Sequence, residues 1–327
     1  SGAWTYTIDN TDSDTTALDA DDSVSDAFTV TGTDTNGGSD TETVTITLTG
    51  ANDATSAGAD QTGAITEDAS TSTATGTVAG TDDDTDAAIT YAAGSTAGTY
   101  GSLALTTSSG AWTYTLDNAD ADTTALDADD SVSDAFTITA TDSDQSSSNT
   151  DTMTVTITVT GANDATSAGA DQTGGVTEDS GSDVTGTVAG TDADDQASIT
   201  YGCSGCADGG ATQTKTGTYG GWTLTEATGA WVYDLDDTDT QTKELDEGDT
   251  ATEGALTVTA TDSDQGSSNT DTMTITITIT GNNDVYTAGV DQTGAVTEDS
   301  GADVTGTVAD TDPDGEASIT FACSGCA

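Results

Sequence analysis

The chain has no histidine, one proline and only two basic residues among 327, against 59 acidic residues. Without histidine it lacks the side chain that most often acts as a general base near neutral pH, and no nucleophile-elbow or P-loop motif is present. No apolar run approaches the roughly 18 residues that a membrane-spanning helix needs. The formal net charge of -57 makes nucleic acid an improbable partner. The composition therefore predicts no enzyme, no membrane span and no nucleic-acid-binding protein.

The apolar residues that are present follow a two-residue period. Met153 to Val159 reads Met-Thr-Val-Thr-Ile-Thr-Val, which places every apolar side chain on one face and every hydroxyl on the other. This is the signature of a half-buried strand, and the sequence shows no convincing helical period. Because the carboxylates repel one another at neutral pH, a compact state needs counter-ions or bound cations. We expect folded all-β modules and not a disordered acidic tail.

Repetition defines the domain organisation. The segment at 141–165 recurs at 33–54 and 261–284, and its markers Gly50, Gly161 and Gly281 are 111 and 120 residues apart. The expected division is listed here: 1–50, the C-terminal half of a repeat; 51–161 and 162–281, two complete repeats; 282–327, the N-terminal half of a further repeat. Since the chain opens inside a repeat, without methionine or signal peptide, we expect a window from a longer polypeptide.

Each complete repeat is predicted to be one β-sandwich. About seven short strands follow one another at regular spacing with turn-rich joins, which is typical of that architecture. Trp112 and Tyr114, with their counterparts in the other repeats, are expected in the core. The nine extra residues of the longer repeat lie between Tyr201 and Gly217, where we expect a surface loop that includes Cys203 and Cys206.

Three motifs in fixed order suggest a family. Gly110–Asn118 reads GAWTYTLDN, an Ala125-Leu-Asp run leads to Phe136, and the repeat ends in Thr-Gly-Ala-Asn-Asp-Ala165. Together they resemble the VCBS repeats, tandem modules of large bacterial surface adhesins and biofilm proteins, and more distantly the cadherins. The resemblance implies secreted, calcium-binding, immunoglobulin-like or cadherin-like β-sandwiches in an extended array. This chain differs in having alanine where such repeats usually place proline after Asn-Asp.

Calcium binding is also consistent with the acidic loops. Calcium takes six to eight oxygen ligands from several loops, and aspartates recur here at fixed positions beside uncharged, Thr-rich strands. We expect loops at one end of a sandwich to meet Asp127 and the Asn-Asp pair at the end of the preceding one. By resemblance to cadherins, we predict metal clusters of Asn52, Asp53, Asp82, Asp84, Asp142 and Asp144; of Asn163, Asp164, Asp192, Asp194, Asp262 and Asp264; and of Asn283, Asp284, Asp312 and Asp314, with Glu67 and Glu178 reaching the junctions.

A simpler explanation of the acidity stays open. Abundant aspartate can keep an exposed surface soluble, for example in high salt. An EF-hand loop and the Gly-rich nonapeptides of calcium-binding β-helices are both absent from the sequence.

The cysteines form two Cys-Ser-Gly-Cys motifs one repeat apart. That separation disfavours a four-cysteine zinc site within one chain. In an extracellular setting we predict two short-loop disulfides, Cys203 with Cys206 and Cys323 with Cys326. Cross-links between laterally adjacent chains are the alternative.

Three functions are consistent with these features. The first is a calcium-stiffened extracellular or cell-surface stalk, in which each module's partners are its neighbours in the same chain. The second is a filament or sheath in which 282–327 of one copy completes 1–50 of the next by strand addition. Direct ligand recognition is the third and weakest, because successive repeats are nearly identical.

Overall fold

The computed structural model describes residues 2–324 except 85–87, 129, 143–148, 195–197, 263–268 and 316–317. It divides into two compact units, Ser1–Asn163 and Asp164–Ala327, which are described separately. Most of the regular secondary structure of the described residues is strand, as predicted. The described helices are single turns of four residues each: α1 (Ser13–Thr16), α2 (Ala121–Thr124) and α3 (Thr240–Lys243). None of them is long enough to cross a membrane.

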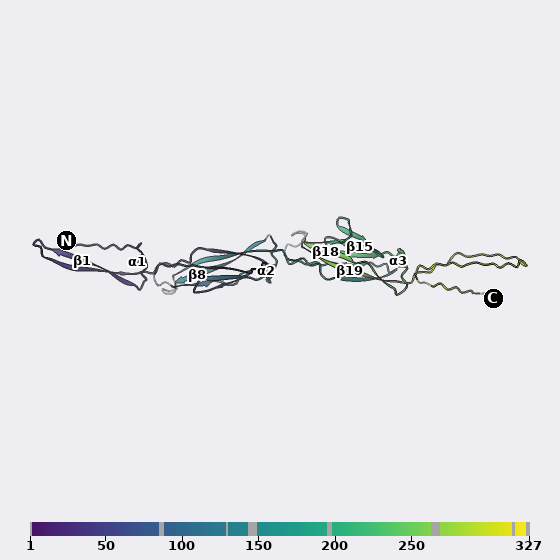
Figure 1. The fold of residues 1–327 in the computed structure, drawn as a ribbon, viewed down its shortest axis with the longest axis horizontal. Coiled ribbons are helices and arrows are strands. Elements are labelled where there is room, and N and C mark those ends of the chain that lie inside the picture. The colour runs from purple at the N-terminus through teal and green to yellow at the C-terminus, as the bar shows by residue number, and fades with distance from the viewer. Residues whose placement is uncertain are drawn as a thin grey trace. The chain divides into compact units, whose positions relative to one another are not determined.

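The first unit contains a complete seven-stranded sandwich, part of which is labelled in Figure 1 by β8 and α2. One sheet has the order β3-β9-β8-β5 and the other β4-β7-β6. β3 pairs with β9 in parallel, and the remaining pairs are antiparallel. The strands are β3 (Gln61–Thr66), β4 (Thr73–Thr77), β5 (Ile89–Ala93), β6 (Gly101–Leu105), β7 (Ala111–Leu116), β8 (Ser131–Asp142) and β9 (Thr150–Thr160).

The two-residue period of β9 produces the core directly. Met153, Val155, Ile157 and Val159 are all buried, while the threonines between them are only partly covered. Trp112 and Tyr114 on β7 belong to the same buried cluster. The core therefore lies between the two sheets, where the sequence predicts it.

The second unit repeats this sandwich with additions (Figure 1). One sheet has the order β10-β19-β18-β12, with β17 also pairing with β19, and the other has the order β11-β16-β15-β14-β13. The strands are β10 (Gln172–Thr177), β11 (Val184–Thr187), β12 (Ile199–Cys203), β13 (Ala207–Asp208), β14 (Thr212–Thr216), β15 (Gly220–Thr225), β16 (Ala230–Leu235), β17 (Thr250–Thr252), β18 (Leu256–Asp262) and β19 (Thr270–Thr280).

The prediction that the insertion in the longer repeat is a surface loop is wrong. The inserted residues form β13 and β14, and β14 pairs antiparallel with β15 along five residues. Thr212–Thr216 alternates Thr-Gln-Thr-Lys-Thr, which suits a strand next to the short edge strand β13, with one partly covered face. The insertion therefore widens a sheet.

A bulge accounts for the division between β17 and β18. Thr252 pairs with Thr278 and Leu256 with Ile275, so three residues on one strand face two on the other. Glu253, Gly254 and Ala255 are the three. The corresponding strand β8 of the first unit is continuous, because it has one residue fewer at this place.

The half-repeats at either end differ from the sandwiches. β1 (Ser23–Thr33) and β2 (Ser39–Thr49) form an antiparallel hairpin, and the described residues beyond Gly281 form one isolated bridge, Thr287 with Thr311, and no strand. Trp4 is 59% exposed, whereas its counterpart Trp112 is 3% exposed. The apolar face of residues 2–50 thus lacks the covering sheet that the complete sandwich has.

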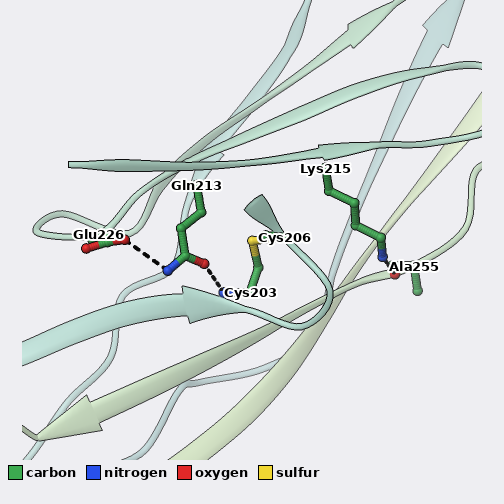
Figure 2. The surroundings of a disulfide bond; sticks show 6 residues. All are labelled: Cys203, Cys206, Gln213, Lys215, Glu226 and Ala255. Carbon is green, nitrogen blue, oxygen red and sulfur yellow. Dashed lines mark hydrogen bonds between the residues drawn. A yellow bond between two sulfur atoms is a disulfide. The ribbon is translucent and has the colours of Figure 1, made fainter. Parts of the chain in front are cut away.

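One disulfide joins Cys203 to Cys206, with 5.6 Å between the Cα atoms, as predicted. It connects the end of β12 in one sheet to the start of β13 in the other. Figure 2 shows Gln213 beside it: the Cys203 N–H donates to Gln213 Oε1 at 2.7 Å, and Gln213 Nε2 donates to Glu226 at 2.9 Å. Cys326 lies outside the described residues, so the second predicted pair stays a prediction.

Candidate metal centre

Three carboxylates converge at one end of the sandwich in the first unit. Asp82 and Asp84 lie in the loop after β4, and Asp142 is the last residue of β8. One oxygen of each lies within 4.8 Å of the others. The Asp84 N–H donates to Asp82 Oδ1 at 3.2 Å, and this local turn fixes the Asp82 side chain.

The segment that leads into the sandwich is bound to this cluster. The Asp53 N–H donates to Asp84 Oδ2 at 2.9 Å, and the Thr55 hydroxyl donates to Asp82 Oδ2 at 2.7 Å. Asn149 fixes the same segment from the other side, accepting from the Thr55 N–H at 2.9 Å and donating to the Asp53 carbonyl at 2.9 Å. The predicted ligands Asp53, Asp82, Asp84 and Asp142 are thus brought together.

The second unit has the same arrangement at the start of its sandwich. The Asp164 N–H donates to Asp194 Oδ2 at 3.1 Å, and the Thr166 hydroxyl donates to Asp192 Oδ2 at 2.6 Å. Asn269 takes the role of Asn149. Asp262 at the end of β18 is fully buried. Asp144 and Asp264, the remaining aspartates predicted for these two clusters, lie outside the described residues.

A further acidic group lies where residues 162–281 lead into 282–324, within the second unit. The Asn282 N–H donates to Glu178 Oε2 at 3.2 Å, and Glu178 is only 2% exposed. The Asp284 N–H donates to Asp314 Oδ1 at 3.1 Å, and the Asp314 N–H to Asp312 Oδ1 at 3.2 Å. These contacts repeat those of Asp53 and Asp84 in the first unit. The segment that joins one repeat to the next, here called a link, therefore has the same local geometry at both places.

The chain passes very close to the preceding loop at this link. A Cβ added to Gly281 would lie 2.4 Å from the Asp246 carbonyl oxygen, which no side chain can tolerate. A glycine is therefore required at each repeat marker, because the backbone of the preceding loop lies too close for any side chain. It brings the linking segment beside the Leu-Asp pair of the α3 loop.

Several buried carboxylate oxygens in these groups accept no hydrogen bond from the described residues. An ionised oxygen removed from water without a donor is unfavourable unless a cation neutralises it. The acceptors of this kind that bear on the links are Asp19 Oδ1, Asp84 Oδ1, Glu178 Oε1, Asp246 Oδ1 and Asp284 Oδ2. The other oxygens of Asp84 and Glu178 accept the backbone N–H groups of Asp53 and Asn282, so these two side chains are held with one oxygen left for another ligand.

The electrostatics of the groups point the same way. Burial raises the pKa of Glu178, and the negative charges of Asp284, Asp179 and Asp237 raise it further, although the Asn282 N–H opposes them. Burial also raises the pKa of Asp53, with additional repulsion from Asp84, Asp83 and Asp82. Raised carboxylate pKa values mean that the ionised forms are under-compensated by the protein alone.

These donor sets fit a hard divalent cation. The available side-chain ligands are carboxylate oxygens, with backbone carbonyls nearby and no sulfur or imidazole nitrogen. Calcium accepts six to eight such oxygens in flexible geometry, whereas zinc prefers nitrogen and sulfur. In the first unit, Asp82, Asp84 and Asp142 would hold the ion. In the second, Glu178, Asp246 and Asp284 have the oxygens suited to it.

Some predicted ligands are placed less favourably, and some residues of these groups were not predicted. Asn52, Asn163 and Asn283 are exposed. Glu67 is buried and accepts from the Ala162 N–H at 3.3 Å. Asp19 and Asp246 were not predicted, although both follow leucine at the repeated Leu-Asp position of Asp127. Asp179 was missed too; its φ of 58° is unusual for a residue with a side chain, and the counterparts Asp68 and Asp299 share it.

Comparisons with known proteins agree with the architecture. Residues 52–161, about one third of the chain, match the model of a family described as bacterial cadherin-like domain, so this repeat is a cadherin-like module. The matched family is not that of the VCBS repeats, so the resemblance to VCBS repeats stays a prediction. No curated protein sequence matches the chain.

Solved structures similar to this chain include animal cadherins. Mouse cadherin-23 EC22-24 is 18% identical, with a TM-score of 0.42, covering 78% of this chain and 74% of that one. Mouse clustered PcdhgC3 EC1-3 is 15% identical, with a TM-score of 0.41, covering 84% and 80%. Drosophila N-cadherin EC1-4 is 16% identical, with a TM-score of 0.29, covering 82% and 61%. At such low scores these likenesses support no statement about function.

Proposed function

We propose that this chain is a structural, calcium-binding repeat region of an extracellular surface adhesin or biofilm-matrix protein. Calcium ions at the acidic groups stiffen the links between repeats. The observation that supports this best is the convergence of Asp82, Asp84 and Asp142 within 4.8 Å, with a buried oxygen of Asp84 that accepts no hydrogen bond from the described residues. Three carboxylates held this close repel one another, and the attraction of each one to a bound divalent cation offsets that repulsion.

Stiffening follows from where the ligands lie. Asp53 belongs to the linking segment, whereas Asp82, Asp84 and Asp142 belong to the sandwich that follows it. In the second unit Glu178 lies in the sandwich and Asp284 in the segment that leaves it. An ion shared by a sandwich and a linking segment restricts the rotations of the link. A module whose role is spacing needs that restriction and no catalytic group.

Thermal unfolding of the full chain in calcium, in magnesium and in a chelator tests the proposal. A ligand at 100 times its Kd stabilises the folded state by about 2.7 kcal/mol, so calcium should raise the melting temperature by several degrees. Sodium chloride at matched ionic strength is the essential control, because screening of the net charge of -57 also stabilises the chain. If sodium chloride reproduces the whole effect of calcium, the acidity serves solubility and the proposal is wrong.

A further inference from the structure

The links are not equivalent, because one of the two basic residues of the chain lies at only one of them. Lys243 is the last residue of α3 and is half-buried. The helices α1 and α2 occupy the same place in their repeats, and both end in threonine, Thr16 and Thr124. The lysine is thus specific to the link between residues 162–281 and the segment after Gly281.

The loop around Lys243 contacts the acidic group directly. The Gly315 N–H donates to the carbonyl of Glu244 at 3.3 Å, which places the end of α3 against the turn that contains Asp314. Asp314 in turn accepts from the Asp284 N–H. Lys243 is therefore one residue from a backbone contact with the loop that would supply ligands to the ion.

The charge of Lys243 reaches the site. Burial raises the pKa of Asp284, as do the negative charges of Asp179 and Asp314, and the Lys243 ammonium group acts in the opposite direction. The ammonium group thus already offsets part of the negative charge that would attract a divalent ion. At the link that contains Asp53, the pKa of Asp53 is raised by burial and then by repulsion from neighbouring aspartates, and lysine has no part in the shift.

We propose that Lys243 lowers the affinity of its own link for calcium, so that this link is the weakest and the last to be filled as calcium rises. The inference rests on the proposed function, since it concerns the same class of site. A chain with unequal links stiffens in steps as the calcium concentration rises and does not stiffen all at once. The ligand is a divalent cation, and the positive charge of the Lys243 ammonium group opposes its binding.

A calcium titration of the ¹⁵N-labelled full chain, followed by NMR, tests this. The amide groups of Asp53 and Asp284 donate to equivalent carboxylates, so they report on the two links within one sample. In the unaltered chain, the Asp284 signal should reach its midpoint at higher calcium than the Asp53 signal. Lys243→Thr, which restores the residue of the other repeats, should lower the Asp284 midpoint about five-fold. That factor corresponds to about 1 kcal/mol, the order of magnitude for one unit charge acting on a nearby divalent ion in water.

The controls separate the possible failures. Lys215→Thr removes the only other lysine, which lies on β14 and donates to the Ala255 carbonyl, and it should move neither midpoint. If Lys215→Thr lowers the Asp284 midpoint as much as Lys243→Thr does, the effect is one of net charge and the inference is wrong. It is also wrong if both amides respond to calcium but Lys243→Thr leaves the Asp284 midpoint unchanged. If neither amide responds to calcium in any variant, the proposed function itself fails, and this inference fails with it.

Discussion

The hydroxyl of Tyr233 donates a 2.9 Å hydrogen bond to the Glu253 carboxylate, and both side chains are buried. Glu253 also accepts from the N–H groups of Thr218 and Tyr219 at 2.9 Å each, so one buried carboxylate binds the Gly-Thr-Tyr-Gly loop to the core. The first unit has the same relationship between Tyr114 and Asp134. The second unit has the longer glutamate at this position, and Glu253 is one of the three bulge residues.

Removal of this hydroxyl should destabilise the second unit. A hydrogen bond to a charged group contributes about 1.5–3 kcal/mol, so Tyr233→Phe should lower the unfolding free energy by about 2 kcal/mol. Hydrogen exchange measured by mass spectrometry on peptides from β15 and β16 reports that unit alone. Tyr6→Phe is the matched control, since Tyr6 makes the same bond to Asp26 in an exposed place, and its loss should change exchange in peptides from β1 and β2 much less. Equal effects of the two substitutions would contradict a role for burial.

Neutralising Asp84 should have opposite effects with and without calcium. With calcium present, Asp84→Asn should weaken binding at this link at least about ten-fold, because it removes one charge from a three-carboxylate site. In chelator it should leave the melting temperature unchanged or higher, since it also removes like-charge repulsion. Calorimetric titration and thermal unfolding measure the two effects.

Asp60→Asn is the control for that experiment. Asp60 accepts from the Thr154 N–H at 2.7 Å at an exposed site away from the cluster, and asparagine keeps the acceptor. The substitution should leave the calcium isotherm unchanged. If Asp60→Asn weakens binding as much as Asp84→Asn, calcium binds diffusely to the acidic surface.

The pH dependence of stability should reverse on adding calcium. Burial and neighbouring carboxylates raise the pKa values of Asp53, Glu178 and Asp284 in the folded chain. The folded state then binds more protons than the unfolded state at mildly acidic pH, so the metal-free chain should gain stability as the pH falls from 7 towards about 5. With calcium bound, protons compete with the ion, and stability should fall over the same interval. Melting temperatures in chelator and in calcium from pH 7 to 5 would show curves of opposite slope; parallel curves would exclude ion binding by these groups.

The disulfide should stabilise only its own unit. Closing so short a loop restricts the unfolded chain by about 2 kcal/mol at most in the loop-entropy description. Cys203→Ser combined with Cys206→Ser should therefore reduce the stability of the second unit by up to this amount and leave the first unchanged. Hydrogen exchange resolves the two units in one experiment. A loss in the first unit would show that the substitution acts by some means other than this loop.

The fold was predictable because a two-residue period dictates which residues are buried. The alternation from Met153 to Val159 is enough by itself to predict the central strand β9. The β13–β14 hairpin was not predictable, because its alternating residues are polar and the insertion resembles a Gly-rich loop. The bulge at Gly254 was also missed, since one added residue is visible only once the strand register is known.

The metal groups were predicted in part for a related reason. Repetition of aspartates beside strands indicated Asp82, Asp84 and Asp142, since strand ends at one edge meet in space. Asn149 and Asp246 were not predicted, because their contribution depends on where the chain passes after each strand. The Tyr233–Glu253 pair was missed because the two residues lie 20 positions apart and only the packing of one sheet on the other brings them together.

The most direct measurement is a crystal structure of the chain grown in calcium, with anomalous scattering to identify the ion. We expect a calcium peak between Asp82, Asp84 and Asp142, at about 2.3–2.6 Å from the buried Asp84 Oδ1. A second peak should lie beside Glu178 and Asp284. Ordinary water at both places, with the carboxylates turned towards solvent, would contradict the claim that calcium holds the links.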